Sequence, residues 1–412
     1  MKILLLHQYF QEKDGKGGAR FNEMTGFWAR AGHKVTVLAG MFHDADGQVA
    51  PRHQGNYTYR DDFAPGVTVI RSAVSANYDR GFLGRLWGYF SFVISSFYAG
   101  LFKLEEKPDV ILVTSPPLFL GITAYLLSRL KGVPFVFEVR DLWPESAIDT
   151  GMVSNGLLIK MAYWLEGFLY GKADHVTVLT PAFRRVLMEQ KGVPAAKVTF
   201  IPNAADFSKT DPLLQTFDRD AFRRENGLEG KTVISYMGAH GLANHLEQVL
   251  DAAELLKGEP EILFQLIGDG PRKPWLKEEA ARRGLTNVRF VDSQPKPQIY
   301  EYIIASDFGT SVLKKVDTFK TIYSNKTFDY MACRRPILMV IDGVSRELVE
   351  QAGCGWYVPP EDPAALSAAA RKAAALPVER RKELGESGYI YAQKHFDRAK
   401  LAEQYLRILT SR

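Results

Sequence analysis

Four polar residues, Ser324, Asn325, Lys326 and Asp329, stand close together in the last quarter of the chain. Serine and asparagine are preferred where a helix begins, so a helix is expected to start there and to lead into the apolar run 337–341. Positions four apart share one helix face, which places Asn325 beside Asp329. The free N–H groups of a helix start, with a lysine beside them, suit a phosphate, and a carboxylate one turn later suits two sugar hydroxyls. One nucleotide would satisfy both groups. The alternative is a solvated acid paired with the lysine.

Loops that contain glycine or basic residues follow several apolar runs of the chain. Glycine lets backbone amides approach a diphosphate, and the helix that follows adds the positive end of its dipole. The loops lack the GxGxxG fingerprint of dinucleotide-binding dehydrogenases, and each taken alone is equally an ordinary turn. Together they predict a phosphate-binding edge of a sheet. The candidate residues are Gly17, Gly18, Gly238, His240, Arg272 and Lys273.

A second polar group, Arg140, Asp141 and Glu145, follows the apolar run 135–138. Ligands of open α/β sheets bind at the carboxyl ends of the strands, so this group is a candidate for contacts with a substrate. The alternative is an interdomain salt bridge with an aspartate that caps a helix.

The elements that must position these residues alternate between strand-like apolar runs and helical patterns, which is typical of parallel sheets built from βαβ units. At 412 residues the chain is long enough for two domains. The fold class expected is α/β, with two doubly wound, Rossmann-like domains joined near 203–220. The predicted strands are 3–6, 35–38, 110–113, 135–138, 176–179 and 198–201 in the first domain, and 233–237, 262–267, 288–291, 308–312 and 337–341 in the second.

The composition narrows the function. Hydrophobic residues make up 46% of the chain, charged residues make up 24%, and the formal net charge is +5, a balance typical of globular proteins that favours anionic partners. No basic run is dense enough for nucleic acid. The two cysteines, Cys333 and Cys354, lack metal-ligand or redox spacing and fit a reducing compartment. No P-loop, GxSxG, HExxH or CxxC motif is present, and no essential metal or cofactor is expected.

The segment 86–102 carries no charged residue. One reading is a long buried helix. Another is a helix on a membrane surface over 82–104, since tryptophan and tyrosine suit the interface and basic residues flank the segment. A true membrane span fits least, because the segment lies within a domain.

Several motifs occur together in a fixed order: Gly-Gly-Ala-Arg at 17–20, Ala-Gly-His-Lys-Val-Thr-Val-Leu at 31–38, Ile-Pro-Asn-Ala at 201–204, Ile-Gly-Asp-Gly-Pro at 267–271 and Ser-Asn-Lys-Thr-Phe-Asp-Tyr-Met-Ala at 324–332. With them the chain resembles glycosyltransferase family 4, the retaining nucleotide-sugar transferases of the GT-B fold, over essentially its full length. Pro116-Pro117 and Arg-Asp-Leu-Trp-Pro-Glu at 140–145 look most like the branch that builds bacterial surface polysaccharides, including N-acetylfucosaminyl-transferase-like members.

The resemblance implies roles for the residues that match the family's motif. A carboxylate at the position of Asp329 binds the ribose hydroxyls of the donor. The usual motif has two glutamates eight positions apart, and Thr321 stands here where the first of them normally meets the sugar ring. The loop 237–245 lacks the usual arginine and lysine for the donor phosphates, so Lys326, Arg272 or Lys273 is expected to replace them. Asp141 is expected to orient the acceptor hydroxyl.

The implied reaction moves a sugar from a UDP-sugar, without a metal, to a lipid-diphosphate-linked acceptor. The protein would rest on the inner face of the bacterial membrane, peripheral and cytoplasmic. Domains are expected at 1–203 and 204–394, and the final helix, about 395–412, is expected to pack back on the first domain, as in similar proteins. Two alternatives stay open: a nucleotide-sugar epimerase of the same architecture, and a non-catalytic polysaccharide assembly factor.

Overall fold

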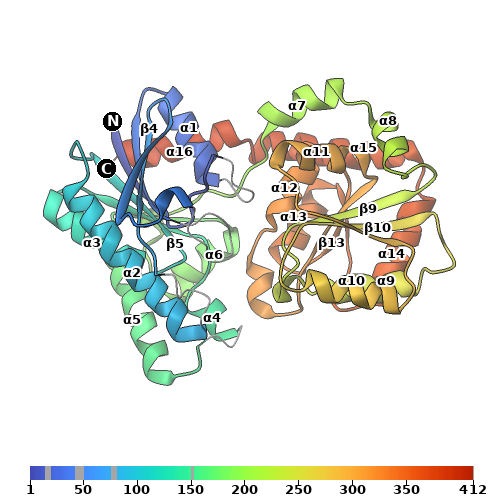
Figure 1. The fold of residues 1–412 in the computed structure, drawn as a ribbon, viewed down its shortest axis with the longest axis horizontal. Coiled ribbons are helices and arrows are strands. Elements are labelled where there is room, and N and C mark those ends of the chain that lie inside the picture. Colours follow the sequence, from blue (N-terminus) through green and yellow to red (C-terminus); the bar gives the residue numbers. More distant parts are fainter. Residues whose placement is uncertain (14–19, 42–50, 76–80, 150–152, 412) are drawn as a thin grey trace. The chain divides into compact units, whose positions relative to one another are not determined.

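The structure, a computed structural model, describes residues 1–13, 20–41, 51–75, 81–149 and 153–411. The chain forms two compact units (Figure 1). Unit 1 contains Met1–Pro202 and Ala399–Arg412, and unit 2 contains Asn203–Arg398. Each unit has a mainly parallel sheet covered by helices, so the predicted fold class is confirmed.

Unit 1 has an eight-stranded sheet in the order β3-β4-β2-β1-β5-β6-β7-β8, in which only β3 is antiparallel to its neighbour. All six strands predicted for this unit are present, but β3 and β4 were not predicted. The strand β3 lies at the edge, and its mostly polar side chains leave no apolar run to recognise. The strands are β1 (Lys2–Leu6), β2 (Lys34–Gly40), β3 (Thr58–Ala64), β4 (Val67–Ser72), β5 (Val110–Ser115), β6 (Phe135–Val139), β7 (His175–Val178) and β8 (Val198–Phe200).

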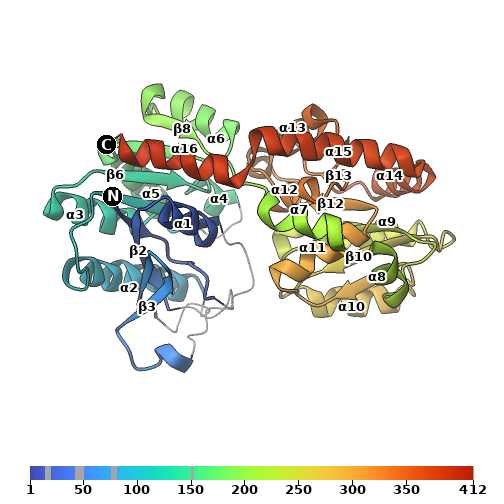
Figure 2. The ribbon, with the colours of Figure 1, turned by 90° about the horizontal axis from the view of Figure 1, so that it is seen from above.

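The helices of unit 1 divide between the two faces of this sheet. Because parallel crossovers are right-handed, helices after β4, β5 and β6 cover one face, and the helix after β1 covers the other. The final helix α16 packs beside α1 (Figure 2), where the Trp28 indole N–H donates to Ala402 O at 3.0 Å. The helices are α1 (Arg20–Arg30), α2 (Gly81–Phe102), α3 (Leu120–Lys131), α4 (Glu145–Asp149), α5 (Gly156–Lys172), α6 (Pro181–Arg185) and α16 (Arg398–Thr410), with short turns η1 (Pro51–His53), η2 (Val186–Gln190) and η3 (Ala195–Lys197).

Unit 2 has a six-stranded, fully parallel sheet in the order β11-β10-β9-β12-β13-β14. The five strands predicted for it are present, and the three-residue strand β14 was not predicted. The strands are β9 (Thr232–Met237), β10 (Ile262–Ile267), β11 (Val288–Val291), β12 (Phe308–Val312), β13 (Ile337–Val340) and β14 (Gly355–Tyr357). The helices are α7 (Phe207–Thr216), α8 (Arg219–Glu225), α9 (Glu247–Glu254), α10 (Lys273–Arg282), α11 (Lys296–Ala305), α12 (Asn325–Ala332), α13 (Val344–Ala352), α14 (Pro363–Ala375) and α15 (Val378–His395), with turns η4 (Leu242–Asn244) and η5 (Asp317–Thr321).

The segment that was expected to join the domains, 203–220, is mostly helical and belongs to unit 2. Helix α7 accommodates Pro212 and packs against α11 and α12. The next helix, α8, begins at the N-cap residue Asp218, whose side chain accepts a hydrogen bond from the backbone N–H of Ala221 at 2.9 Å. The polar residues of this segment therefore start helices and do not mark an irregular linker.

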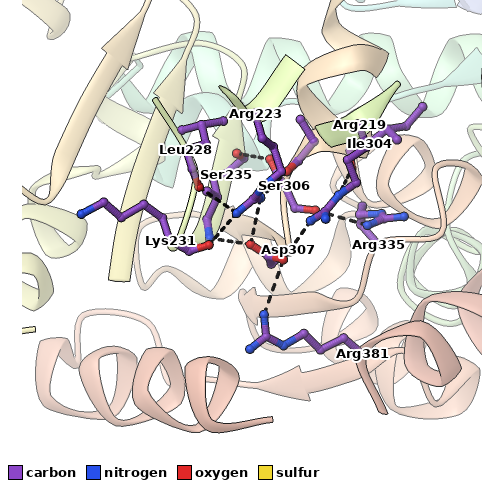
Figure 3. A network of polar contacts seen from close by, with 12 residues as sticks. Arg219, Arg223, Leu228, Lys231, Ser235, Ile304, Ser306, Asp307, Arg335 and Arg381 are labelled. Carbon is purple, nitrogen blue, oxygen red and sulfur yellow. Dashed lines mark hydrogen bonds and ion pairs between the residues drawn. The ribbon is translucent and has the colours of Figure 1, made fainter. Parts of the chain in front are cut away.

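A network around Asp307 fastens α8 and α15 to the start of strand β12 (Figure 3). The Asp307 carboxylate accepts from Arg219 at 2.9 Å and from Arg223 at 3.2 Å, and it lies 3.4 Å from Arg381. It also accepts the backbone N–H of Val233 at 2.8 Å, which ties β12 to β9. One largely buried carboxylate thus holds three guanidinium groups, two from α8 and one from α15.

Helix α12 sits on the sheet through close contact between one tyrosine and one glycine. A Cβ atom at Gly309 would lie 2.4 Å from the ring of Tyr330, so only glycine leaves room for that ring on strand β12. The Tyr330 hydroxyl donates to Ser235 O and Thr310 O, each at 2.9 Å. These contacts fix α12 over β9 and β12, with its first turn at the carboxyl ends of the strands.

Candidate functional site

The first turn of α12 begins where the sequence predicted. Ser324 occupies the N-cap position in an extended conformation, but among the described residues its side chain makes no capping hydrogen bond. Its hydroxyl donates instead to Ser311 Oγ at 3.2 Å, in the buried interior of the unit. Asn325 is exposed and accepts a hydrogen bond from the side chain of Asn203 through its amide oxygen. The first N–H groups of α12 are therefore not capped by the Ser324 hydroxyl.

Lys326 lies over the end of strand β9. Its Nζ is 4.8 Å from the centre of the Tyr236 ring and 3.5 Å from Ser324 Oγ, which is its one hydrogen bond within the described part of the chain. Its Cε would lie 3.3 Å from a Cβ at Gly238, whose φ of +137° also disfavours a side chain. Burial lowers the pKa of Lys326 to about 8, while nearby Asp329 favours its charged form. Lys326 is therefore a cation at neutral pH with little protein contact to satisfy it.

Asp329 is one turn further along α12 and is partly exposed. Its Oδ1 lies 3.5 Å from the Tyr300 hydroxyl. Because Asn325 and Asp329 are four positions apart, the helix presents them on the same side, as the sequence predicted. Thr321 ends the turn η5, and its hydroxyl donates to Thr318 O at 2.6 Å, so that hydroxyl is engaged with the backbone of its own turn.

The glycines after β9 and β10 bring two loops into contact with each other. A Cβ at Gly268 would lie 2.0 Å from Gly238 O, and one at Gly270 would lie 2.7 Å from His240 O. The backbone N–H groups of Gly238 and His240 donate to Ile267 O and Asp269 O at 2.9 and 2.8 Å. These glycines are thus required for loop packing at the edge where α12 begins.

His240 is fully buried, which its loop position did not indicate. Its ring packs against Tyr236 and Phe290, and neither ring nitrogen has a hydrogen-bond partner in the described part of the protein. Burial, together with the nearby charge of Lys273, lowers its pKa to about 4, so the imidazole is neutral at pH 7. His240 can contribute a ring N–H but not a positive charge.

Arg272 and Lys273, the two other cations expected to serve an anion, both donate to acceptors within unit 2. The Arg272 guanidinium donates to Glu247 at 2.6 and 3.1 Å and stacks on Trp275. Lys273 is buried, and its Nζ donates to Gly268 O at 2.8 Å and to Asp292 at 2.6 Å. The two cations thus tie the start of α10 to the start of α9 and to the end of β11, and Lys326 is the better placed of the three candidates for a phosphate.

In unit 1, Asp141 follows strand β6, as expected. Its carboxylate accepts from the Ser146 hydroxyl at 2.8 Å, and burial raises its pKa. Arg140 turns back toward Glu138, with 3.9 Å between Nε and Oε1, and Glu145 accepts from Lys191 at 2.7 Å. The partners of Arg140 and Glu145 named here, Glu138 and Lys191, lie in unit 1.

Two polar features of unit 1 were missed. Gln8 follows β1 at the carboxyl edge of the sheet and is buried, and its amide has no hydrogen-bond partner within the described residues. Arg140 was selected because it follows a strand at the carboxyl edge of the sheet, and the same rule would have selected Gln8.

Arg20 donates to Glu138 at 3.1 Å, and Glu138 in turn accepts from the hydroxyl of Tyr405 in the last helix. Glu138 and Tyr405 are 267 positions apart, so no local sequence pattern could have predicted that they pair. Gly17 and Gly18 lie outside the described residues.

The part of the chain that the structure describes contains neither a candidate metal site nor a candidate membrane span. No group of histidine, cysteine, aspartate or glutamate side chains there has the arrangement of a metal site. No helix there is long and apolar enough to cross a membrane.

Comparisons with known proteins agree with this two-unit architecture. Residues 17–204 match the family described as Glycosyl transferase 4-like domain, and residues 218–391 match Glycosyl transferases group 1. The putative colanic acid biosynthesis glycosyl transferase WcaI of Escherichia coli is 26% identical, with 98% of this chain and 99% of WcaI covered. The probable glycosyltransferase WbjE of Pseudomonas aeruginosa is 28% identical over 66% of this chain and 68% of its own.

Solved structures show the same fold. HepE of Anabaena in complex with UDP superposes with a TM-score of 0.72 at 18% identity, and both chains are fully covered. Sucrose-phosphate synthase of Thermosynechococcus elongatus gives a TM-score of 0.74 at 16% identity, with 100% of this chain and 98% of that chain covered. Among the three functions that the sequence left open, the family matches select the transferase. The chain is therefore a glycosyltransferase that belongs to family 4 and has the GT-B fold.

Proposed function

We propose that this glycosyltransferase moves a sugar from a UDP-sugar to an acceptor hydroxyl, with retention of configuration, in the synthesis of a bacterial surface polysaccharide. The observation that carries the donor assignment is the placement of Lys326 and Asp329 in the first two turns of α12, at the carboxyl edge of the sheet in unit 2. The UDP complex of HepE and the name of WcaI support the choices of nucleotide and pathway.

In this proposal the departing diphosphate is stabilised electrostatically. The first N–H groups of α12 and the Lys326 ammonium supply positive charge where the leaving group becomes more negative, and the Asp329 carboxylate accepts hydrogen bonds from two ribose hydroxyls. This mechanism requires no metal. Asp141 orients the acceptor hydroxyl, and its raised pKa suits a group that shares a proton with that hydroxyl.

The finer assignment is an N-acetylamino sugar as donor and a lipid-diphosphate-linked saccharide as acceptor, with the protein peripheral on the inner face of the membrane. The similarity of 116–117 and 140–145 to surface-polysaccharide transferases supports it. Thr321, in place of the usual carboxylate, removes a negative charge from the part of the pocket that meets the sugar ring, so the choice of sugar is expected to differ from that of relatives that carry the glutamate.

Titration calorimetry with UDP, GDP and ADP in buffer containing a chelator tests the donor assignment. We expect selective binding of UDP and a loss of about tenfold or more in affinity for Asp329→Ala, because two hydrogen bonds to a charged acceptor are removed. Asp317→Ala, which removes an exposed acid in the preceding turn, is the matched control and should bind UDP normally. Equal UDP affinity in both variants would exclude Asp329 from the site.

The affinity for UDP should also depend on pH. Because the pKa of Lys326 is lowered to about 8, its ammonium is mostly charged at pH 7 and mostly neutral at pH 9. A phosphate binds the charged form, so the affinity should fall about tenfold between pH 7 and pH 9, while the charge of the diphosphate is already complete at pH 7. Calorimetry at several pH values measures this slope. The slope should disappear in Lys326→Met, and a slope that persists there would assign it to another group.

A further inference from the structure

Helix α5 of unit 1 presents an apolar face to solvent. Leu157, Met161 and Trp164 follow one another at helical spacing and are 68%, 57% and 69% exposed. The Trp164 ring stacks on Phe168, with 5.6 Å between the ring centres, which gives this face a fixed aromatic platform. A soluble protein rarely leaves a run of this kind uncovered, so the face indicates a partner.

The charges on α5 select the kind of partner. Lys160 and Lys172 are exposed on the helix, and Lys172 lies 5.8 Å from the centre of the Phe168 ring. The one acid of the helix, Glu166, is buried, where it accepts from Lys191 at 2.6 Å and from the Tyr170 hydroxyl at 2.9 Å. The residues of α5 itself therefore present apolar side chains and positive charge outward and no carboxylate, while one exposed acid of α4, Asp149, lies near Tyr163 of α5.

The neighbouring helices extend this surface. Helices α2, α3 and α5 cover the same face of the sheet, and α3 packs against both of the others (Figure 1). The exposed fractions of Leu130 in α3 and of Ile94 and Phe102 in α2 are 62%, 56% and 65%. The opposite side of α2 is buried in the unit, as Phe92 and Ala99 show. The segment 86–102 is thus buried on one side and apolar and exposed on the other, and its contact with a membrane surface stays a prediction.

We infer that this three-helix surface seats the protein on acidic phospholipid, with α5 as the helix that inserts most deeply. Apolar and aromatic side chains, with lysines and without exposed acids, are what a helix in the plane of an anionic bilayer surface presents. A second copy of the chain would bring the same positive charges together, which disfavours self-association through α5. This inference rests on the proposed function, because a lipid-linked acceptor must be met at the membrane.

Co-sedimentation of the full chain with vesicles tests the inference. The probes are vesicles of phosphatidylcholine alone and of phosphatidylcholine mixed with phosphatidylglycerol. We expect binding to the mixed vesicles that weakens as salt is raised. The triple variant Leu157→Gln/Met161→Gln/Trp164→Gln should bind them at least about tenfold more weakly, since it removes the apolar contacts. The control Leu255→Gln/Val378→Gln/Ile390→Gln changes three exposed apolar residues of unit 2 and should bind like the wild type.

The outcomes separate this inference from the proposed function. Equal vesicle binding by the α5 variant, or no vesicle binding by the wild type, would overturn it, and so would a wild-type dimer that the α5 variant converts to monomer without any vesicle binding. UDP titration of the same proteins is the second measurement. The α5 variant should keep the affinity of the wild type for UDP, and thermal unfolding with the transitions of the wild type shows that its unit 1 is folded. Vesicle binding without UDP binding would leave the surface intact and contradict the donor assignment.

Discussion

Replacing Lys326 by methionine is expected to lower kcat of sugar transfer by about 10²–10³-fold, the range found when one preorganised donor to a developing oxyanion is removed. Methionine keeps most of the volume of lysine over Tyr236 and Gly238 but removes the charge. Arg272 and Lys273 cannot compensate from their present positions, because Glu247 and Asp292 hold them. The effect should fall on kcat more than on KM, since the charge of the diphosphate increases as the bond to the sugar breaks.

Steady-state transfer from a UDP-sugar measures this effect. Lys382→Met, at an exposed lysine of α15 that pairs with Glu379, is the matched control and should leave kcat unchanged. Lys326→Arg keeps the charge and should recover part of the activity. If Lys326→Met raised KM tenfold and left kcat unchanged, the lysine would contribute to ground-state binding alone. If it changed neither, another cation would serve the leaving group.

The start of α12 was predictable because its signal is local. Ser324 and Asn325 are helix-start residues, and the spacing from Asn325 to Asp329 follows from helical geometry alone. The parallel strands were predictable for a similar reason, since strands buried on both faces are continuous apolar runs. Strand β3 has mostly polar side chains and lies at an edge, so the same rule could not find it.

The state of each basic residue was not predictable, because it depends on distant partners. Arg272 is neutralised by Glu247, 25 positions away, and Lys273 by Asp292, 19 positions away. No carboxylate within the described part of the chain forms an ion pair with Lys326, yet nothing in its immediate sequence distinguishes it from the other two. Likewise, the sequence near His240 is typical of an exposed loop, and only the packing of Tyr236 and Phe290 buries it.

Replacing Asp307 by alanine is expected to cost about 3–5 kcal/mol of the free energy of unfolding of unit 2, because guanidinium groups would be left in a largely buried site without their counter-ion. The side chains of Asp307, Arg223 and Arg381 are 11%, 10% and 16% exposed. Arg223 would keep its bonds to backbone carbonyls, among them 2.7 Å to Ala305 O, but those carbonyls cannot neutralise its charge. The loss also removes the acceptor for the Val233 N–H between β12 and β9.

Thermal unfolding of the full chain measures the loss. For a unit of this size the transition temperature should fall by about 10 °C. Asp317→Ala, which breaks an exposed pair with Lys320, is the matched control and should change stability by less than about 1 kcal/mol. Asp307→Asn keeps an oxygen for the Val233 N–H and should lie between the wild type and Asp307→Ala. If Asp307→Ala were as stable as Asp317→Ala, the arginines would be solvated in place, and α8 and α15 would be held to the sheet by apolar packing alone.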